Sequence, residues 1–534
     1  MFKFKDLNIW HVLILIICSI FFIPLIFIGG SILFGINENF YHLYENLLLD
    51  YALNSLYLVL GVSCLVTILG VSTALLVTYF DFFGKKFFQW ALILPLAVPP
   101  YLLAYVFTEF FDFSGTANVF ARNIFDLQND VAIFPNIRTI TGAVIVFGFT
   151  LYPYVYMISR VALMNIPASV IEASILLGRN KIFTFFNLSI PLIRPAIIAG
   201  LALVAMETLS DFGAVEHFAI PTFTTGIFRT WTGLYDLTTA LQLSTMLLLV
   251  VFIFLAIERN SRNKIRYANS NYENNAYKPI QLKTYKSSIA FIICLLPVFI
   301  GFILPVLELI NWATQIDNIF SNKVFTAASN TLFVASLAAF LTCLLALFIN
   351  FSVRSLKIPQ VFNDLLSLGY AVPGLILAVG ITQMFTSIDF WIANSNFFIT
   401  GSIIGLILAY IIKSYAISNN VLNSSYAGIP KSVDESAQTL GANKSRLLQE
   451  VHIPLLNTGL LTAFLLVLAE LIKELPATLI LRPFNFDTLS VSVYLLASEE
   501  RMFQAAFPGL VIIGFGLIPI YLSLIHISEP TRPS

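Results

Sequence analysis

Long apolar runs alternate with short polar segments along the whole chain. The hydrocarbon core of a bilayer requires about 20 apolar residues per helix, and twelve runs approach this length. They lie near 10–34, 54–80, 88–109, 139–159, 191–213 and 239–257, and near 287–311, 329–352, 364–386, 399–419, 454–480 and 503–524. The pattern predicts an all-α polytopic membrane protein with about twelve transmembrane helices.

One long polar segment divides these runs into two sets of six. Residues 258–286 have no apolar periodicity and are rich in Asn, Lys and Tyr, which is typical of an interdomain linker. We therefore predict the following division: a first domain over 1–258 with its core over 48–258, a cytoplasmic linker over 259–286, and a second domain over 287–524 with its core over 324–524.

The two ends of the chain differ in character. The first apolar run is too long for the core of a signal peptide, and no small-residue cleavage site follows it, so we predict a retained anchor. The polar tail over 525–534 resembles vector- or adapter-derived sequence, and no function is drawn from it.

The distribution of positive charge predicts the orientation of the chain. With a cytoplasmic N-terminus, the inner segments hold 20 Lys and Arg residues and the outer segments hold six. Because Lys and Arg accumulate in cytoplasmic loops, we expect the N-terminus and the loops at 160–190 and 413–452 to face the cytoplasm.

Composition supports a membrane protein and argues against an enzyme. Only 11% of the residues are charged, against about 25% in a soluble domain. The four cysteines lie inside apolar runs and are expected to be small buried residues rather than disulfides or metal ligands. No Walker A motif, H-E-x-x-H motif or other catalytic constellation occurs, and His452 is expected to pack in a loop. We predict no catalytic residue, no certain metal ligand and no cofactor bound by this chain.

A polar motif occurs twice, 263 residues apart. It reads EASILLGRNKIFTFFNLSIPLI over 172–193 and ESAQTLGANKSRLLQEVHIPLL over 435–456. Upstream, Val98-Pro99 resembles Val372-Pro373. These matches indicate an internal duplication. Because each half has an even number of spans, the halves insert the same way up and form a parallel repeat, with both motifs on one side of the membrane.

Each copy predicts two short helices joined at a glycine elbow. A proline opens the first helix, and a Ser followed three residues later by Glu has the spacing of a capping box. The glycine can end the helix with a positive φ, and an Ile-Pro-Leu sequence then begins the next membrane helix. The residues in question are Pro167, Ser169, Glu172, Gly178 and Pro191 in the first copy, and Pro430, Ser432, Glu435, Gly441 and Pro454 in the second.

The doubled motif resembles the signature loop of binding-protein-dependent ABC importer permeases. The resemblance implies the type I (MetI-like) permease fold, two loops that dock on a separate cytoplasmic ATPase dimer, ATP used by that partner, and a periplasmic substrate-binding protein. The sequence departs from the family's Glu-Ala-Ala pattern at one small residue in each copy, Ser174 and Ser436, and in having Pro before Leu. The implied coupling residues are Glu172, Ala173, Ser174, Gly178 and Pro191, with Glu435, Ser436, Ala437, Gly441 and Pro454.

The segment METLSDFGAVEHFAIPTFTTGIFRTW, residues 206–231, is similar to fused ferric-iron permeases of the bacterial inner membrane, which cover this whole length with twelve spans. The resemblance favours ferric iron as the cargo. Thiamine permeases share the fused architecture, whereas sulfate, molybdate and polyamine permeases share the loops but usually occur as separate chains. A secondary transporter driven by an ion gradient remains an alternative, against which the doubled loop argues. A membrane scaffold without transport is a weaker one, which neighbouring genes for a binding protein and an ATPase would disfavour.

Four acidic residues lie within the apolar runs. Glu207 and Asp211 are spaced i, i+4, and Glu470 and Glu474 repeat that spacing, so each pair shares one helix face. Acids at such depth usually face a bundle interior or a water-filled path, and hard oxygen ligands suit a highly charged cation. The alternative is that these acids cap helix ends or pair locally, for example with Lys473. The two interpretations are balanced for Glu207 and Glu470, and capping or pairing is favoured for Asp211 and Glu474.

Overall fold

The computed structural model describes residues 9–126, 128, 131–179, 181–268, 279–316, 322–356, 358–392 and 398–528. Within these ranges, nine helices are long and apolar enough to cross a membrane, or eleven if two bent helix pairs each count as one span. The strands in the same ranges are the two-residue β1 (Phe80–Asp81) and β2 (Ile280–Gln281). The prediction of an all-α polytopic membrane protein is confirmed.

Each of the twelve predicted runs falls on a helical segment. In the first half these are α1 (Ile9–Gly30), α3 (Leu48–Tyr79), α4 (Lys85–Ala91) with α5 (Pro100–Phe110), α7 (Ile140–Met164), α10 (Ile190–Ser210) and α13 (Leu237–Ala268). In the second half they are α14 (Thr284–Val298) with α15 (Leu304–Thr314), α16 (Asn322–Ser355), α17 (Gln360–Leu366) with α18 (Gly374–Trp391), α19 (Ile403–Ala427), α23 (Asn457–Ile472) and α26 (Met502–Ser528). The helices α7 and α19 have the same length and start 263 residues apart, as the sequence repeat requires.

Two predicted spans are broken at the repeated Val-Pro pairs. The first half bends by 89° between residues 97 and 100, around Val98-Pro99. The second half leaves the helix at Val372, directly before Pro373. Both valines have extended backbone, with ψ near 111° and 107°, because proline disfavours helical geometry in the residue that precedes it. The expectation of continuous spans was wrong here.

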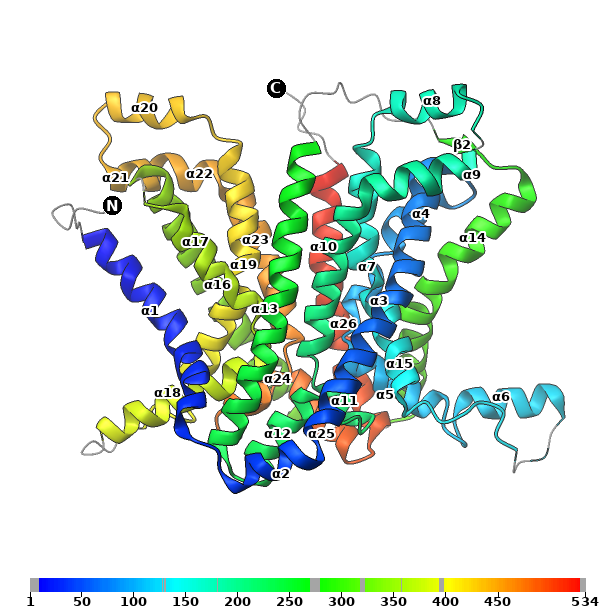
Figure 1. Cartoon of the computed structure of the whole chain (residues 1–534), viewed down its shortest axis with the longest axis horizontal. Coiled ribbons are helices and arrows are strands. Elements are labelled where there is room, and N and C mark those ends of the chain that lie inside the picture. Colours follow the sequence, from blue (N-terminus) through cyan, green and yellow to red (C-terminus); the bar gives the residue numbers. More distant parts are fainter. Residues whose placement is uncertain are drawn as a thin grey trace.

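The two halves point the same way. The short helices α8 (Ala168–Leu176) and α20 (Lys431–Thr439), which carry the repeated motif, both lie at one end of the molecule (Figure 1). The helices α2 (Glu38–Asn46), α12 (Phe223–Gly233) and α25 (Leu489–Ser498) lie at the opposite end (Figure 1). This arrangement agrees with the predicted parallel repeat.

The first helix of each half packs against the other half. α1 contacts α17 and α18 of the second half. In the other direction, α14 contacts α3 and α4 of the first half, α15 contacts α5, and the π-helical turn between them (Phe299–Ile303) contacts α7. One hydrophobic core therefore joins first-half residues with α14, α15 and α26, and the other joins second-half residues with α1 and α13. The unit of sequence repetition is not the unit of packing, and the domain boundaries stay a prediction.

The predicted linker contains regular structure. α13 continues to Ala268, and β2 pairs in parallel with β1, placing Ile280 opposite Phe80. Residues 269–278 lie outside the described residues. The pairing with β1 holds the chain that leads into α14 beside the end of α3, and the assignment of 259–286 as a cytoplasmic linker stays a prediction.

The cysteines are free, and their burial differs from the prediction in one respect. Cys294 and Cys343 are buried, but Cys64 is exposed on the surface of the helix bundle. The expected burial inside the protein was therefore wrong for Cys64, because its apolar helix presents that face to the outside.

The packing of α1 against the second half gives a testable prediction. A Cβ at Gly380 of α18 would lie 2.9 Å from the carbonyl oxygen of Pro24 and 2.7 Å from Ile28 in α1, so Gly380→Val should force the two helices apart. We expect a loss of about 1–3 kcal/mol of stability, measured as a lower thermal midpoint of the detergent-solubilised chain. Gly29→Val is the control, since a Cβ at Gly29 meets nothing within 4 Å. Equal midpoints for the two variants would contradict the packing of α1 on α18.

Candidate functional site

Each copy of the repeated motif folds as two short helices that lead into a membrane helix. In the first copy, α8 is followed by α9 (Lys181–Thr184) and a π-helical turn (Phe185–Ser189). In the second, α20 is followed by α21 (Lys444–Arg446), a π-helical turn (Leu447–His452) and α22 (Ile453–Leu455). The predicted pairs of short helices are confirmed, and the π-helical turn recurs at equivalent positions.

The glycine elbows are confirmed. Gly178 and Gly441 have φ values of +81° and +83°, a left-handed conformation that costs a residue with a Cβ about 1–2 kcal/mol. The turn that follows closes with a hydrogen bond from the Ala442 amide to the Ala437 carbonyl at 3.0 Å. The Arg179 amide donates in the same way to the Ser174 carbonyl at 3.3 Å. Only glycine fits this turn without strain.

The predicted capping box is absent from the second copy. Pro430 itself occupies the N-cap of α20, and no side chain caps the helix. The helix opens instead with a bond from the Val433 amide to the Pro430 carbonyl at 3.2 Å. Ser432 therefore lies inside the first turn, so that Ser432 and Glu435 do not hold the capping positions.

The start of the following membrane helix also differs between the copies. Pro191 lies at the beginning of α10, as predicted. Pro454 lies in α22, and the chain then bends by 73° before α23 begins at Asn457. The second membrane helix thus begins after the bend rather than at Pro454, and this part of the prediction was wrong.

The outer faces of both loops are exposed and carry leucine. Glu172, Ala173, Glu435 and Ser436 are exposed, and Ser174 and Ala437 are half-buried. Next to the elbows, three leucine side chains are almost fully exposed, with exposed fractions of 87% for Leu176, 82% for Leu177 and 89% for Leu440. Exposed apolar side chains grouped beside charged ones are typical of a surface that a partner covers. The sequence analysis gave these leucines no role.

An arginine anchors the second loop to the body of the protein. Arg354, at the end of α16, donates to both carboxylate oxygens of Asp434 in α20, at 2.7 and 3.1 Å. Its remaining hydrogen bonds go to the carbonyls of Tyr426, Ile429 and Pro430. All five donors of the guanidinium thus join the end of α19 to the start of α20.

His452 completes this anchor from the π-helical turn. Its Nε2 lies 3.0 Å from Asp434 Oδ1 and its Nδ1 lies 3.4 Å from the Tyr426 hydroxyl. Because a carboxylate only accepts, Nε2 carries the hydrogen and donates it to Asp434. The side chain is fully buried, which agrees with the predicted role in loop packing.

The first loop is anchored by apolar contacts. The offset of 263 residues places Ile171 and Ser189 at the positions of Asp434 and His452, and Ile171 is fully buried. Phe185 of the π-helical turn stacks on Tyr79 at the end of α3, with ring centroids 4.7 Å apart. The two loops therefore share their backbone shape but not the chemistry that holds them.

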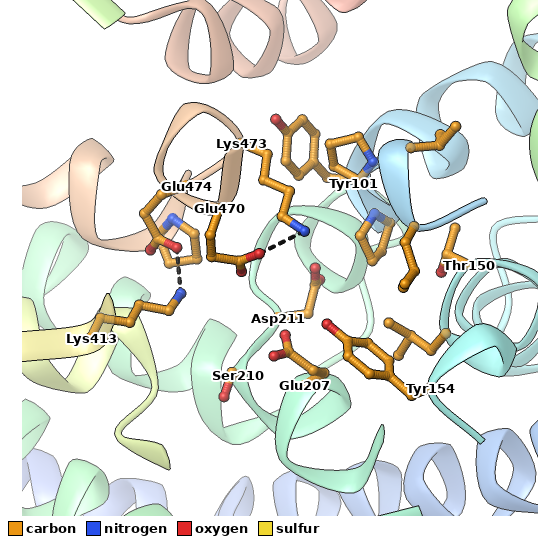
Figure 2. A pocket seen from close by; sticks show the side chains of 16 residues that line it. Tyr101, Thr150, Tyr154, Glu207, Ser210, Asp211, Lys413, Glu470, Lys473 and Glu474 are labelled. Carbon is orange, nitrogen blue, oxygen red and sulfur yellow. Dashed lines mark hydrogen bonds and ion pairs between the residues drawn. The ribbon is translucent and has the colours of Figure 1, made fainter. Parts of the chain in front are cut away.

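The four intramembrane acids converge on one central cavity of about 90 Å³ (Figure 2). Glu207, Asp211, Glu470 and Glu474 line it, together with Lys413 of α19 and Lys473 at the end of α23. The broken span at Val98-Pro99 forms another part of the wall. Helices far apart in the sequence thus bring six charged side chains to one point.

Each acid has a hydrogen-bonding partner. Lys473 Nζ lies 2.8 Å from a carboxylate oxygen of Glu470, and Lys413 pairs with Glu474. The Tyr370 hydroxyl donates to Glu207 at 2.9 Å. The pairing of Lys473 with Glu470, which the sequence analysis had considered, is confirmed, whereas the partner of Glu474 is Lys413.

Asp211 and Glu474 also cap short helices. Asp211 Oδ1 accepts from the Ala214 amide of α11 (Gly213–His217) at 2.9 Å. Glu474 Oε1 accepts from the Ala477 amide of α24 (Pro476–Leu481) at 3.2 Å. The backbone carbonyl of each acid also accepts a hydrogen bond at 2.8 Å from a hydroxyl of the next helix. The donor is Thr224 for Asp211 and Ser490 for Glu474. Capping, favoured for these two residues, is confirmed in both halves.

The lysines of the cavity do not follow the repeat. At the offset of 263 residues, Lys413 and Lys473 correspond to Thr150 and Ser210, which also line the cavity. Lys413 lies in the middle of α19 rather than in the inner loop to which the charge count had assigned it. Among the residues that the structure describes, no three His, Cys, Asp or Glu side chains form a group that could hold a metal ion.

Comparison with known proteins identifies the class of protein. Residues 66–267 match the family described as "Binding-protein-dependent transport system inner membrane component". The chain is 26% identical over 483 residues to the Fe(3+)-transport system permease protein FbpB 2 of Haemophilus influenzae, covering 88% of each chain. Residues 66–267 thus carry a permease domain of the binding-protein-dependent type, and the likeness to a ferric permease extends over most of the chain.

Other relatives show how far the likeness extends. The ferric transport system permease protein FbpB of Actinobacillus pleuropneumoniae is 25% identical over 472 residues, covering 84% of this chain and 66% of that protein. The molybdenum transport system permease protein ModB of Haemophilus influenzae is 27% identical over 150 residues, covering only 28% of this chain. The permease is thus a multi-pass inner-membrane transport subunit whose likeness to the ferric permeases includes both halves.

The anchor of the second loop predicts a pH dependence. Burial raises the pKa of Asp434, but hydrogen bonds from Arg354 and His452 lower it further, so the pKa lies below its ordinary value. A carboxyl with a lowered folded pKa stabilises the fold above its unfolded pKa of about 3.9, and this contribution is lost as the pH falls through the folded pKa. The protection factor of the α20 amides, which is the intrinsic exchange rate at each pH divided by the observed rate, should therefore be high near neutral pH and fall below about pH 4.

Replacing the arginine or the acid should reproduce the loss at neutral pH. Arg354→Met removes charge-assisted hydrogen bonds, and we expect α20 to lose about 1–3 kcal/mol of protection, with exchange of α8 unchanged as the internal control. In Asp434→Asn the loss of protection in acid should disappear. Exchange of α20 that is the same in the wild type and both variants would contradict the anchor.

Proposed function

We propose that this permease forms the translocation pathway of an importer for ferric iron. It receives its cargo from a periplasmic binding protein and is driven by a separate cytoplasmic ATPase dimer, which uses the ATP. The cargo proposal rests on the likeness to the ferric permeases over 88% of the chain. The distribution of Lys and Arg supports a cytoplasmic N-terminus.

The doubled loop is the observation that carries the coupling proposal. Two exposed helices, α8 and α20, lie at the same end of the molecule (Figure 1). Each ends in a left-handed glycine beside a leucine that is more than 80% exposed, Leu177 or Leu440. Two equivalent surfaces on one side match a partner with two-fold symmetry. The residues that couple the permease to the ATPase are thus the two sets identified in the repeated motif, one around Gly178 and one around Gly441.

The acidic cavity supports a cation as the cargo. Glu207 and Glu470 come from equivalent helices and line the same space. Carboxylates are the hard oxygen ligands that suit a highly charged cation, and they would repel an oxyanion such as molybdate or sulfate. We therefore place Glu207, Glu470 and the neighbouring Asp211 and Glu474 on the substrate pathway. Thiamine, a cationic organic solute, is the second candidate cargo.

Reconstitution tests the importer. With its ATPase and its ferric-loaded binding protein, the purified chain should take up iron into proteoliposomes when ATP is supplied. Without the ATPase no ATP-dependent uptake is expected, and uptake that persists on an ion gradient alone would favour the secondary transporter. Glu207→Gln with Glu470→Gln should abolish iron uptake and retain ATPase activity. Normal uptake in that variant would remove these acids from the pathway and leave the permease function intact.

The elbows test the coupling loops. Gly178→Val with Gly441→Val imposes about 1–2 kcal/mol of backbone strain at each loop, while a Cβ at either position meets no other atom within 4 Å. The chain should still insert, and the ATPase should no longer co-purify with it. Gly428→Val, at a glycine with φ of −75° directly after α19, is the control. Unchanged co-purification in the double variant would show that these loops are not the coupling elements.

A further inference from the structure

The charges in the central cavity are unevenly divided between the two halves. Each half supplies two acids, but both lysines come from the second half. Four carboxylates therefore face two ammonium groups in a space of about 90 Å³. Thr150 and Ser210 show that the same fold accepts small neutral side chains at the two lysine positions. The lysines are thus not required by the backbone geometry of the site.

Glu207 and Asp211, the two acids that form no ion pair with a lysine, accept hydrogen bonds from neutral groups. Glu207 accepts from the Tyr370 hydroxyl, and Asp211 accepts from backbone amides of α11. Lys473 extends from the end of α23 toward Glu470, in the cavity that Glu207 and Asp211 also line (Figure 2). Its ammonium group therefore stands where a cation entering the cavity would meet the carboxylates of both halves.

The two lysines differ in how firmly the backbone holds them. Lys413 lies within the 25-residue helix α19, whose backbone is fixed by helical hydrogen bonds. Lys473 is the C-cap residue of α23, and the chain leaves helical geometry between it and α24. A side chain at such a break can turn away with little change in the helices on either side. Its position at the helix break thus distinguishes Lys473 from Lys413.

We propose that Lys473 is a tethered counter-cation that closes the substrate cavity against cargo. While Lys473 is paired with Glu470, its ammonium group occupies the position that a cargo cation would take. A multivalent cation must displace this group in order to reach Glu470, Glu207 and Asp211. Lys413 remains paired with Glu474 and holds the second-half wall. The inference rests on the proposed cation pathway and adds a residue that determines when, and for which charge, the site is available.

A purely structural role for Lys473 predicts a different result. If the lysine only neutralises Glu470 in a buried setting, its removal lowers stability and creates no binding site. If it is a surrogate cation, its removal frees the position for an external hard cation. Because a tethered group acts at a high effective concentration, the gain in affinity should be large.

The test uses Tb³⁺ as a hard trivalent probe on the purified full-length chain. Tyr101 and Tyr154 line the cavity and can sensitise the emission of a bound Tb³⁺ ion. Lys473→Ser, which copies Ser210 of the first half, should raise the affinity for Tb³⁺ by at least about tenfold. Adding Glu207→Gln and Glu470→Gln should remove that gain. Lys323→Met, at an exposed lysine of α16, should bind Tb³⁺ like the wild type.

The outcomes separate this inference from the proposed cargo. No gain in Tb³⁺ affinity for Lys473→Ser in a chain with a normal thermal midpoint, or a gain that persists without the two glutamates, would overturn it. If Lys473→Ser does not fold, Lys473→Met provides the same comparison with a side chain of similar length. Wild-type iron uptake tests the cargo separately, so a gain in Tb³⁺ affinity without iron uptake would retain the counter-cation and reject ferric iron.

Discussion

The cost of placing charge inside a membrane determines how the centre of this permease is built. A charged side chain at the bilayer centre is tolerated only when it pairs or faces a polar space. Here Glu470 and Glu474 are paired with lysines, Glu207 with a tyrosine hydroxyl and Asp211 with backbone amides. Tyr370 reaches Glu207 across the boundary between the halves, so satisfying the charges also joins the halves.

The breaks in the membrane helices follow from the same requirement. Backbone that is not helical can lie at membrane depth only where it is buried in protein or lines a cavity. The break at Val98-Pro99 and the turns after α10 and α23 all line the central cavity. Asp211 and Glu474 accept hydrogen bonds from first-turn amides of the short helices that follow, which have no partner within the helix. The same two acids therefore cap the broken backbone and charge the cavity.

The duplication kept geometry more strictly than chemistry. Both loops retain the left-handed glycine and the π-helical turn, because these determine the direction of the exposed helix. The contacts behind the loops diverged into the Arg354, Asp434 and His452 anchor on one side and apolar packing around Ile171 on the other. In the cavity the acids were retained in both halves and the lysines occur in one. A single fused chain can accumulate such side-chain differences because each half always packs against the other half and never against a second copy of itself.

The sequence alone determined the elements that depend on local or periodic signals. Apolar run length predicted the twelve helical segments, the constant offset predicted the repeat, and Gly178 and Gly441 predicted left-handed elbows, since each follows from residues close together in the chain. The tertiary structure alone decided what contacts what. The packing of α1 on α18, the pairing of Lys413 with Glu474, the anchor at Arg354 and the meeting of the four acids all join residues distant in sequence. Apolar patterning cannot specify such contacts, because every helix in a bilayer is apolar and the choice among neighbours depends on close packing, as at Gly380, and on the pairing of buried charges.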